Sequence, residues 1–137
     1  MPNDIAKLRR LMRRAHYIQS TVPNSNWNFS LHSAWWYESV RDALNNGMAR
    51  FTFSKKDGSS RSALGTRSPI LIPADKLPKS SLADLDDKEA DNYRTIPYFD
   101  LDKNEWRSFS VLNFISLDKV WRFNDPLPFN ITPYGNR

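Results

Sequence analysis

The sequence predicts an α+β fold in which two helices precede a small antiparallel β-barrel. Three observations support this prediction. Apolar residues recur at helical spacing through the first 47 residues, and from residue 48 their period changes to two. A length of 137 residues suits one domain with one core. We therefore expect a single domain over residues 1–137, with a helical part at 1–47, a barrel at 48–123 and an irregular tail at 124–137.

The first helix is expected to begin at Asp4, a suitable N-cap, and to end before Pro23. One face of this helix is apolar and the opposite face is basic. We expect the apolar face to pack against the domain and the arginines to stay in solvent. The apolar face holds Ile5, Leu8, Leu11, Met12, Ala15 and Ile18, and the basic face holds Lys7, Arg9, Arg10, Arg13 and Arg14 with Tyr17 among them.

The second helix is expected from Ser30 to about Asn46, with Gly47 as a left-handed C-cap. Trp35 projects to the other side from the main apolar stripe, together with Leu31, so Trp35 and Trp36 cannot share one buried face. The main stripe consists of Trp36, Tyr37, Val40, Ala43 and Leu44.

Two hairpins are expected in the barrel, at residues 48–66 around an Asp57-Gly58 turn and at residues 97–117. Between them, residues 70–72 form a short apolar run suited to a buried strand, and residues 80–92 form an acidic surface loop or short helix. The expected barrel core is Phe51, Phe53, Phe99, Leu101, Phe109, Val111 and Ile115.

The charge is unevenly distributed. The net charge is +5 and the isoelectric point is near 9.6. Residues 1–20 and residues 41–67 each carry a net charge of +4, whereas residues 68–104 carry −3. A surface that attracts polyanions is therefore expected in the first half of the chain.

Several classes of protein are not expected. The mean hydropathy is −0.66, and no apolar run approaches the roughly 20 residues of a membrane helix. The charged start of the chain does not resemble a secretory signal, and the absence of cysteine fits a cytoplasmic protein. The two histidines, His16 and His32, lack an acidic neighbour at one-turn spacing, and the four glycines form no phosphate-binding loop. We therefore expect no enzyme, no catalytic residue, no metal site and no cofactor.

Three segments resemble a known family. They are FTFSKKDGSSR at residues 51–61, Ile72-Pro73, and YFDLDKNEWRSF at residues 98–109. They resemble the small SH3-like β-barrel proteins of unknown function carried by phages and mobile elements of gut anaerobes, and more distantly WYL domains. Residues 11–18 and 33–35 are similar to an N-terminal module that recurs in proteins of such elements. The resemblance implies an SH3-like barrel and the cytoplasm of a bacterial host cell.

Similarity to WYL domains implies that the barrel face binds a nucleic-acid strand or a nucleotide-like ligand. The chain departs from the motif where Pro97 replaces its tryptophan, where Phe99 replaces its leucine, and at residues 113–114. The positions that match it are Gly58, Arg61, Tyr98, Arg107 and Phe109.

These observations favour a non-enzymatic module that holds the phosphate backbone of DNA or RNA on a basic helix and on the barrel hairpins. Two alternatives stay open: a phage-encoded interaction or inhibitor module that binds a host protein, and a receptor with a pocket between barrel and helices for a small, nucleotide-like ligand. Trp35 and Trp106 are candidate stacking or partner-binding residues. The predicted nucleic-acid-binding residues are Arg10, Arg13, Arg14, Tyr17, Lys55, Lys56, Arg61 and Arg107.

Overall fold

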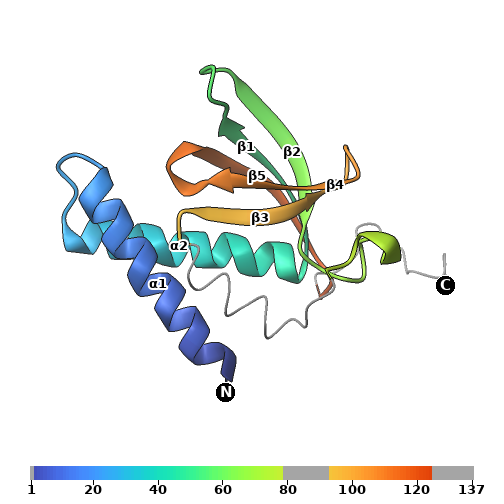
Figure 1. Ribbon diagram of the computed structural model, residues 1–137, viewed down its shortest axis with the longest axis horizontal. Coiled ribbons are helices and arrows are strands. Elements are labelled where there is room, and N and C mark those ends of the chain that lie inside the picture. The colour runs from blue at the N-terminus through green and yellow to red at the C-terminus, as the bar shows by residue number, and fades with distance from the viewer. Residues whose placement is uncertain (1, 79–92, 125–137) are drawn as a thin grey trace.

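A computed structural model describes residues 2–78 and 93–124 (Figure 1). It confirms the predicted order of two helices followed by an antiparallel sheet. The elements are α1 (Pro2–Thr21), α2 (Trp27–Asn45), β1 (Gly47–Ser54), β2 (Ser60–Thr66), the 3₁₀ turn η1 (Ala74–Lys76), β3 (Thr95–Asp100), β4 (Glu105–Ser110), the 3₁₀ turn η2 (Val111–Asn113) and β5 (Phe114–Arg122). Within these described ranges, neither helix is long and apolar enough to cross a membrane.

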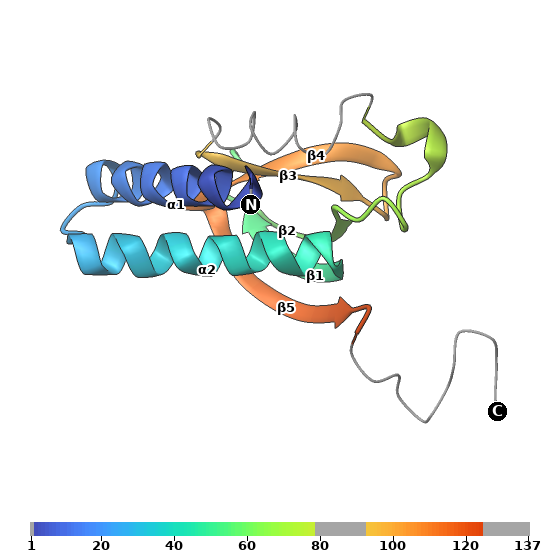
Figure 2. The same ribbon diagram turned by 90° about the horizontal axis from the view of Figure 1, so that it is seen from below.

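The two helices lie side by side and run in opposite directions (Figure 2). Helix α2 begins three residues earlier than predicted, because the side chain of Asn26 caps it by accepting a 2.8 Å hydrogen bond from the Phe29 amide. The predicted Gly47 cap is wrong, since α2 ends at the C-cap Asn46 and Gly47 opens β1. A Cβ at Gly47 would lie 1.9 Å from the Trp121 carbonyl oxygen, so close approach of β5 requires the glycine.

The sheet has five strands in the order β4-β3-β2-β1-β5, and every described pairing is antiparallel. The hairpin of β1 and β2 confirms the prediction for residues 48–66, and its turn contains Gly58 at a φ of +87°. The second hairpin is shorter than predicted, because β4 ends at Ser110 and η2 redirects the chain. Strand β5 then pairs with β1 at the far side of the sheet.

The main core lies between α2 and the inner face of the sheet. It contains Val40, Leu44, Ala49, Phe51, Ala63, Ile96, Tyr98, Phe109 and Val111, with Phe53, Phe114 and other half-buried residues packed against it. This confirms Phe51, Phe109 and Val111 as core residues.

Three of the residues predicted for the barrel core lie outside the main core cluster. Phe99 is buried, but it pairs with Trp106 on the other face of the sheet, because Ile96 and Tyr98 hold the inner positions of β3. Leu101 is half-buried outside the core cluster. Ile115 is 56% exposed, and its neighbour Phe114 packs on the core instead, because η2 shifts the alternation by one residue.

The connector after β2 contains no strand at residues 70–72. Residues 69–71 form a turn in which the Leu71 amide donates to the Ser68 carbonyl, so Ile70 is exposed and only Ile72 is buried. The predicted acidic segment at residues 80–92 and the predicted tail beyond Asn124 lie outside the described residues.

Replacement of Phe109 by alanine should be strongly destabilising. The Phe109 ring contacts Phe51, Tyr98 and Phe114 with centroid distances of 5.2, 6.0 and 5.0 Å. Loss of this ring from a packed core is expected to lower the free energy of unfolding by about 3–5 kcal/mol in urea titrations followed by circular dichroism. The control Ile115→Ala, at an exposed position, should change it by less than about 0.5 kcal/mol. Equal effects of the two changes would contradict the core described above.

Candidate nucleic-acid interface

Helix α1 packs through only part of the apolar face that was predicted. Leu11, Ala15 and Ile18 are buried as expected, but Ile5 and Leu8 are 66% and 59% exposed. Met12 is also exposed. The expectation that all the arginines stay in solvent is wrong for two of them, because Arg10 is 3% exposed and Arg14 is 1% exposed.

Both buried arginines bind the carboxylate of Glu38 on α2, which is itself buried. Arg10 donates to Glu38 Oε1 from Nε at 3.1 Å and from Nη2 at 2.9 Å, and Arg14 Nη1 donates to Oε2 at 3.3 Å. Arg14 Nε also donates to the Tyr93 carbonyl at 3.1 Å. This network joins α1 to α2 and to the residues that lead into β3. It therefore explains why α1 turns these two arginines inward.

The buried network is rich in positive charge, because Arg41 is buried as well. Burial lowers the pKa of the Arg14 guanidinium below its ordinary value, and the charges of Arg10 and Arg41 act in the same direction, while Glu38 opposes them. Among the described residues, the carboxylate of Glu38 is thus the counter-charge for the guanidinium groups of Arg10 and Arg14. Arg10 and Arg14 are consequently structural in this fold, and they leave the candidate interface.

A second arginine pair lies at one end of the barrel, on either side of Asp100. Arg61 Nη2 donates to Asp100 Oδ2 at 2.6 Å, and Arg107 Nε lies 4.0 Å from the same oxygen. Asp100 is fully buried, and its Oδ1 accepts from the amides of Asp102 and Lys103, both at 3.0 Å. The carboxylate therefore fixes the β3–β4 turn and the Arg61 guanidinium, and it adds a longer ionic contact to Arg107.

Four of the five positions that match the WYL motif lie close together in the structure, and the fifth, Gly58, lies in the β1–β2 turn. Tyr98 is fully buried, lies opposite Arg107 in the β3–β4 register, and contacts the rings of Phe51 and Phe109. Burial, reinforced by the charge of Asp100, raises the pKa of Tyr98 to about 12. Its hydroxyl has no hydrogen-bond partner among the described residues.

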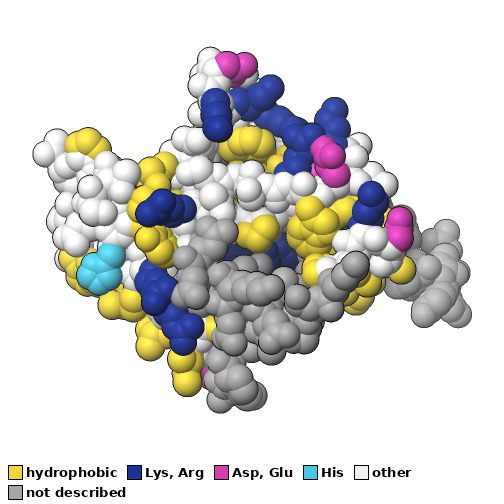
Figure 3. Space-filling view, in the orientation of Figure 1, with side chains coloured by type: hydrophobic (Ala, Val, Ile, Leu, Met, Phe, Trp, Pro, Cys, Tyr) yellow, Lys and Arg dark blue, Asp and Glu magenta, His cyan; other side chains and the backbone are white. Residues whose placement is uncertain are grey.

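Two exposed lysines extend this end of the barrel, because Lys55 and Lys56 occupy the β1–β2 turn. Arg61 and Arg107 expose 19% and 37% of their side chains, and Glu105 also binds Arg107 through both Nε and Nη2. Figure 3 shows lysine and arginine side chains gathered over this hairpin and the adjacent strands. We call Lys55, Lys56, Arg61 and Arg107 the hairpin patch.

The other two predicted residues of the basic helix lie at a different place. Arg13 is exposed, and Tyr17 is half-buried near the C-terminal end of α1, where its ring meets Tyr93 at a centroid distance of 5.7 Å. Arg94 lies over the Tyr17 ring at 5.6 Å. Tyr93 and Arg94 were not predicted as site residues, because no sequence pattern connects them to α1. Only the folded chain brings Tyr93 and Arg94 beside Tyr17.

The predicted tryptophans differ in their surroundings. Trp35 is 52% exposed on α2, so it is available to a partner. Trp106 is 38% exposed, and its Nε1 donates to the Lys76 carbonyl at 2.7 Å while its ring packs edge-on against Phe99. The prediction that Trp36 is buried is wrong. Its ring is 43% exposed and lies edge-on against Phe114 at 5.1 Å, because Tyr37 takes the more interior position.

The histidines do not form part of a metal site in the described residues. His16 and His32 are both exposed, and the His16 ring lies 4.8 Å from the Trp27 ring. Over residues 2–78 and 93–124, no group of three or more potential metal ligands gathers.

Comparison with known proteins identifies the barrel. A family model named WYL_2, described as an Sm-like SH3 beta-barrel fold, matches residues 37–115. The chain belongs to the WYL_2 family. It is also similar to an uncharacterized 11.5 kDa protein in the Gp31-cd intergenic region of Enterobacteria phage T4, with 32% identity over 81 residues that cover 59% of this chain and 76% of the phage protein. No solved structure matches.

The WYL_2 match confirms the expected SH3-like barrel, and the T4 protein confirms the expected similarity to small phage proteins. Residues 37–115 begin within α2 and end at the start of β5. The matched region therefore contains the whole hairpin patch together with Tyr98, whereas α1 with Arg13 and Tyr17 lies outside it.

Neutralisation of Glu38 should destabilise the protein. Glu38→Gln keeps the shape of the side chain but leaves Arg10 and Arg14 buried without their carboxylate, which is expected to cost about 3–5 kcal/mol of unfolding free energy. The matched control is Asp42→Asn, one turn later on α2, where the 3.5 Å pair with Lys7 is exposed and should contribute no more than about 1 kcal/mol. Urea titrations of the two variants measure the difference, and similar small losses in both would contradict the role of Glu38.

Ionisation of Tyr98 should make the fold sensitive to high pH. The pKa of Tyr98 is about 12 in the folded state and about 10 in an unfolded chain, so the unfolded state loses its proton first. Deprotonation of Tyr98 therefore favours the unfolded state. The fold keeps its full stability below pH 10 and loses stability as the pH rises from about 10 to about 12. In urea titrations across this range, Tyr98→Phe should lose less stability than the wild type, and at pH 7 the two should be similar. Parallel losses in both proteins would contradict this assignment.

Proposed function

We propose that the protein is a non-enzymatic module that binds the phosphate backbone of a nucleic-acid strand through the hairpin patch. The observation that supports this proposal is the convergence of two exposed lysines and two oriented arginines at one end of a WYL_2 barrel. Similarity to WYL domains favours the same face of the barrel.

The geometry suits phosphate binding. A hydrogen bond to Asp100 orients the Arg61 guanidinium, and hydrogen bonds to Glu105 orient that of Arg107, which lowers the entropic cost of forming further hydrogen bonds. Each guanidinium keeps N–H donors beyond those that bind Asp100 and Glu105. Lys55 and Lys56 add mobile point charges at the rim, in the exposed turn.

Contacts between cationic side chains and phosphates depend on the charge and geometry of the strand and do not distinguish one base from another. We therefore propose binding with little sequence preference and strong dependence on salt concentration. Arg10 and Arg14 have no part in this binding, because their guanidinium groups are buried against Glu38.

A second candidate function is docking to a host protein. Large apolar side chains are exposed around the outer side of α2 and the start of β5, where the Trp36 ring contacts Phe114. Exposed aromatic clusters are typical of protein interfaces. The exposed residues of this region are Phe29, Trp35, Trp36, Leu112 and Ile115.

Charge reversal in the hairpin patch tests the first proposal. In fluorescence anisotropy titrations with labelled single-stranded DNA and RNA at low salt, the double change Lys55→Glu and Lys56→Glu should weaken binding by at least about tenfold for every sequence. It should also reduce the slope of log K against log salt by about one unit or more.

The charge-matched control is Lys7→Glu with Arg9→Glu on α1, which should retain most of the affinity. Equal losses in both double variants would place binding outside the hairpin patch. Absence of binding to any strand below roughly 10⁻⁴ M would contradict the nucleic-acid function and favour the host-protein candidate.

A further inference from the structure

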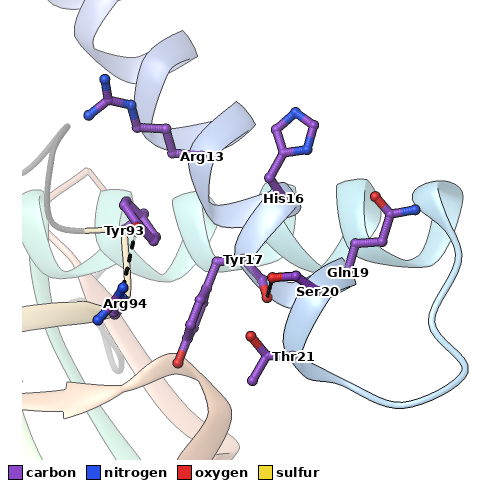
Figure 4. A pocket seen from close by; sticks show the side chains of 8 residues that line it. All are labelled: Arg13, His16, Tyr17, Gln19, Ser20, Thr21, Tyr93 and Arg94. Atoms are coloured by element: carbon purple, nitrogen blue, oxygen red, sulfur yellow. Dashed lines mark hydrogen bonds between the residues drawn. The ribbon is translucent and has the colours of Figure 1, made fainter.

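An open groove lies between the C-terminal end of α1 and the residues that lead into β3 (Figure 4). Its volume is about 900 Å³, which falls within the range of small-molecule sites. The lining side chains come from two segments that are far apart in the sequence: Arg13, His16, Tyr17, Gln19, Ser20 and Thr21 from α1, and Tyr93 and Arg94 from the start of the second hairpin.

The groove combines cationic and aromatic groups. The Arg94 guanidinium lies 5.6 Å from the centre of the Tyr17 ring and 5.4 Å from that of Tyr93, and Arg13 lies one turn before Tyr17 on α1 with its guanidinium directed away from Arg94. Among the described residues that line the groove there is no carboxylate. The Arg94 guanidinium beside the two rings therefore favours a ligand that is both aromatic and negatively charged.

The buried network builds this groove. Arg14 Nε donates to the Tyr93 carbonyl at 3.1 Å, which holds residues 93 and 94 beside α1. Burial of Arg14 in this network places the preceding residue, Arg13, on the exposed side of α1. The groove is thus a consequence of how α1 docks, and it includes a helix that lies outside the region matched by the WYL_2 model.

We propose that this groove binds one nucleotide unit of a bound strand, with the base stacked on Tyr17 or Tyr93 and the phosphate on Arg94. This inference rests on the proposed function and assigns it a second contact, apart from the hairpin patch. Tyrosine rings stack on any base, and arginine binds phosphate through paired N–H donors. The polar side chains of Gln19 and Thr21 can bond to the sugar or the base edge. An acidic peptide would use the arginines alone, whereas a nucleotide uses both the rings and the charges.

The first test uses adenosine monophosphate, adenosine and inorganic phosphate as probes on the full chain. In two-dimensional ¹H–¹⁵N NMR titrations, adenosine monophosphate should shift the amide signals of residues 13–21 and 93–94. Adenosine and inorganic phosphate should each bind at least about tenfold more weakly, because each lacks one half of the contacts. Binding of phosphate as tightly as the nucleotide would overturn the proposal in favour of a plain anion site.

The second test uses variants of the groove. Tyr17→Ala and Arg94→Gln should each weaken binding of adenosine monophosphate by about tenfold, and Tyr17→Phe, which keeps the ring, should stay within about twofold of the wild type. Arg9→Gln removes a charge from the exposed side of α1 outside the groove and serves as the matched control. Thermal melting of each variant shows that the fold is intact. Unchanged binding in Tyr17→Ala and Arg94→Gln would overturn the groove as the site.

The two proposals fail separately. If strands bind and respond to Lys55→Glu with Lys56→Glu but not to Tyr17→Ala or Arg94→Gln, the groove assignment is overturned and the hairpin-patch function stands. If adenosine monophosphate binds in the groove but no labelled strand binds at any salt concentration, the strand-binding function is overturned. Loss of strand affinity in both sets of variants supports both proposals.

Discussion

The carboxylate of Glu38 is the constraint on which the arrangement of the helices depends. Taking charged groups out of water is costly, and the cost is offset only when partners meet with good hydrogen-bond geometry. Glu38 meets this condition for Arg10 and Arg14, and Arg14 extends the contact to the Tyr93 carbonyl. The rotation of α1 about its axis follows. A rotation that buried Ile5 and Leu8 would have turned Arg10 and Arg14 away from Glu38.

Asp100 has a comparable role at the other end of the molecule, with a different outcome. It is also buried and also holds two arginines, but here the guanidinium groups of Arg61 and Arg107 reach the surface. The first cluster therefore stabilises the packing of the helices, whereas the second places two guanidinium groups at the surface. Residue type alone does not separate these roles, since each cluster consists of arginines around a buried acidic side chain.

The two candidate binding areas have different relations to the family. The hairpin patch lies within residues 37–115, so it belongs to the WYL_2 barrel. The groove needs α1, which precedes this region. Helix α1 thus adds cationic and aromatic side chains beside the barrel, and Glu38, one residue inside the matched region, is the group that fixes it there. A strand that touches both areas would meet the barrel and its added helix together.

The sequence by itself determined the elements and much of the barrel. Period-two alternation and the Asp57-Gly58 turn predicted the first hairpin, and the spacing of aromatic residues placed Phe51 and Phe109 in the core. The motif resemblance grouped Arg61, Tyr98 and Arg107 before the structure placed them together. Only the tertiary structure decided the buried face of α1, the pairing of β5 with β1, and the groove of Tyr17 and Arg94. A helical projection ranks the faces of one helix by hydrophobicity, but it cannot show which arginines will find a partner that offsets the cost of burial. Glu38, the partner of Arg10 and Arg14, lies 28 and 24 residues away from them in the sequence.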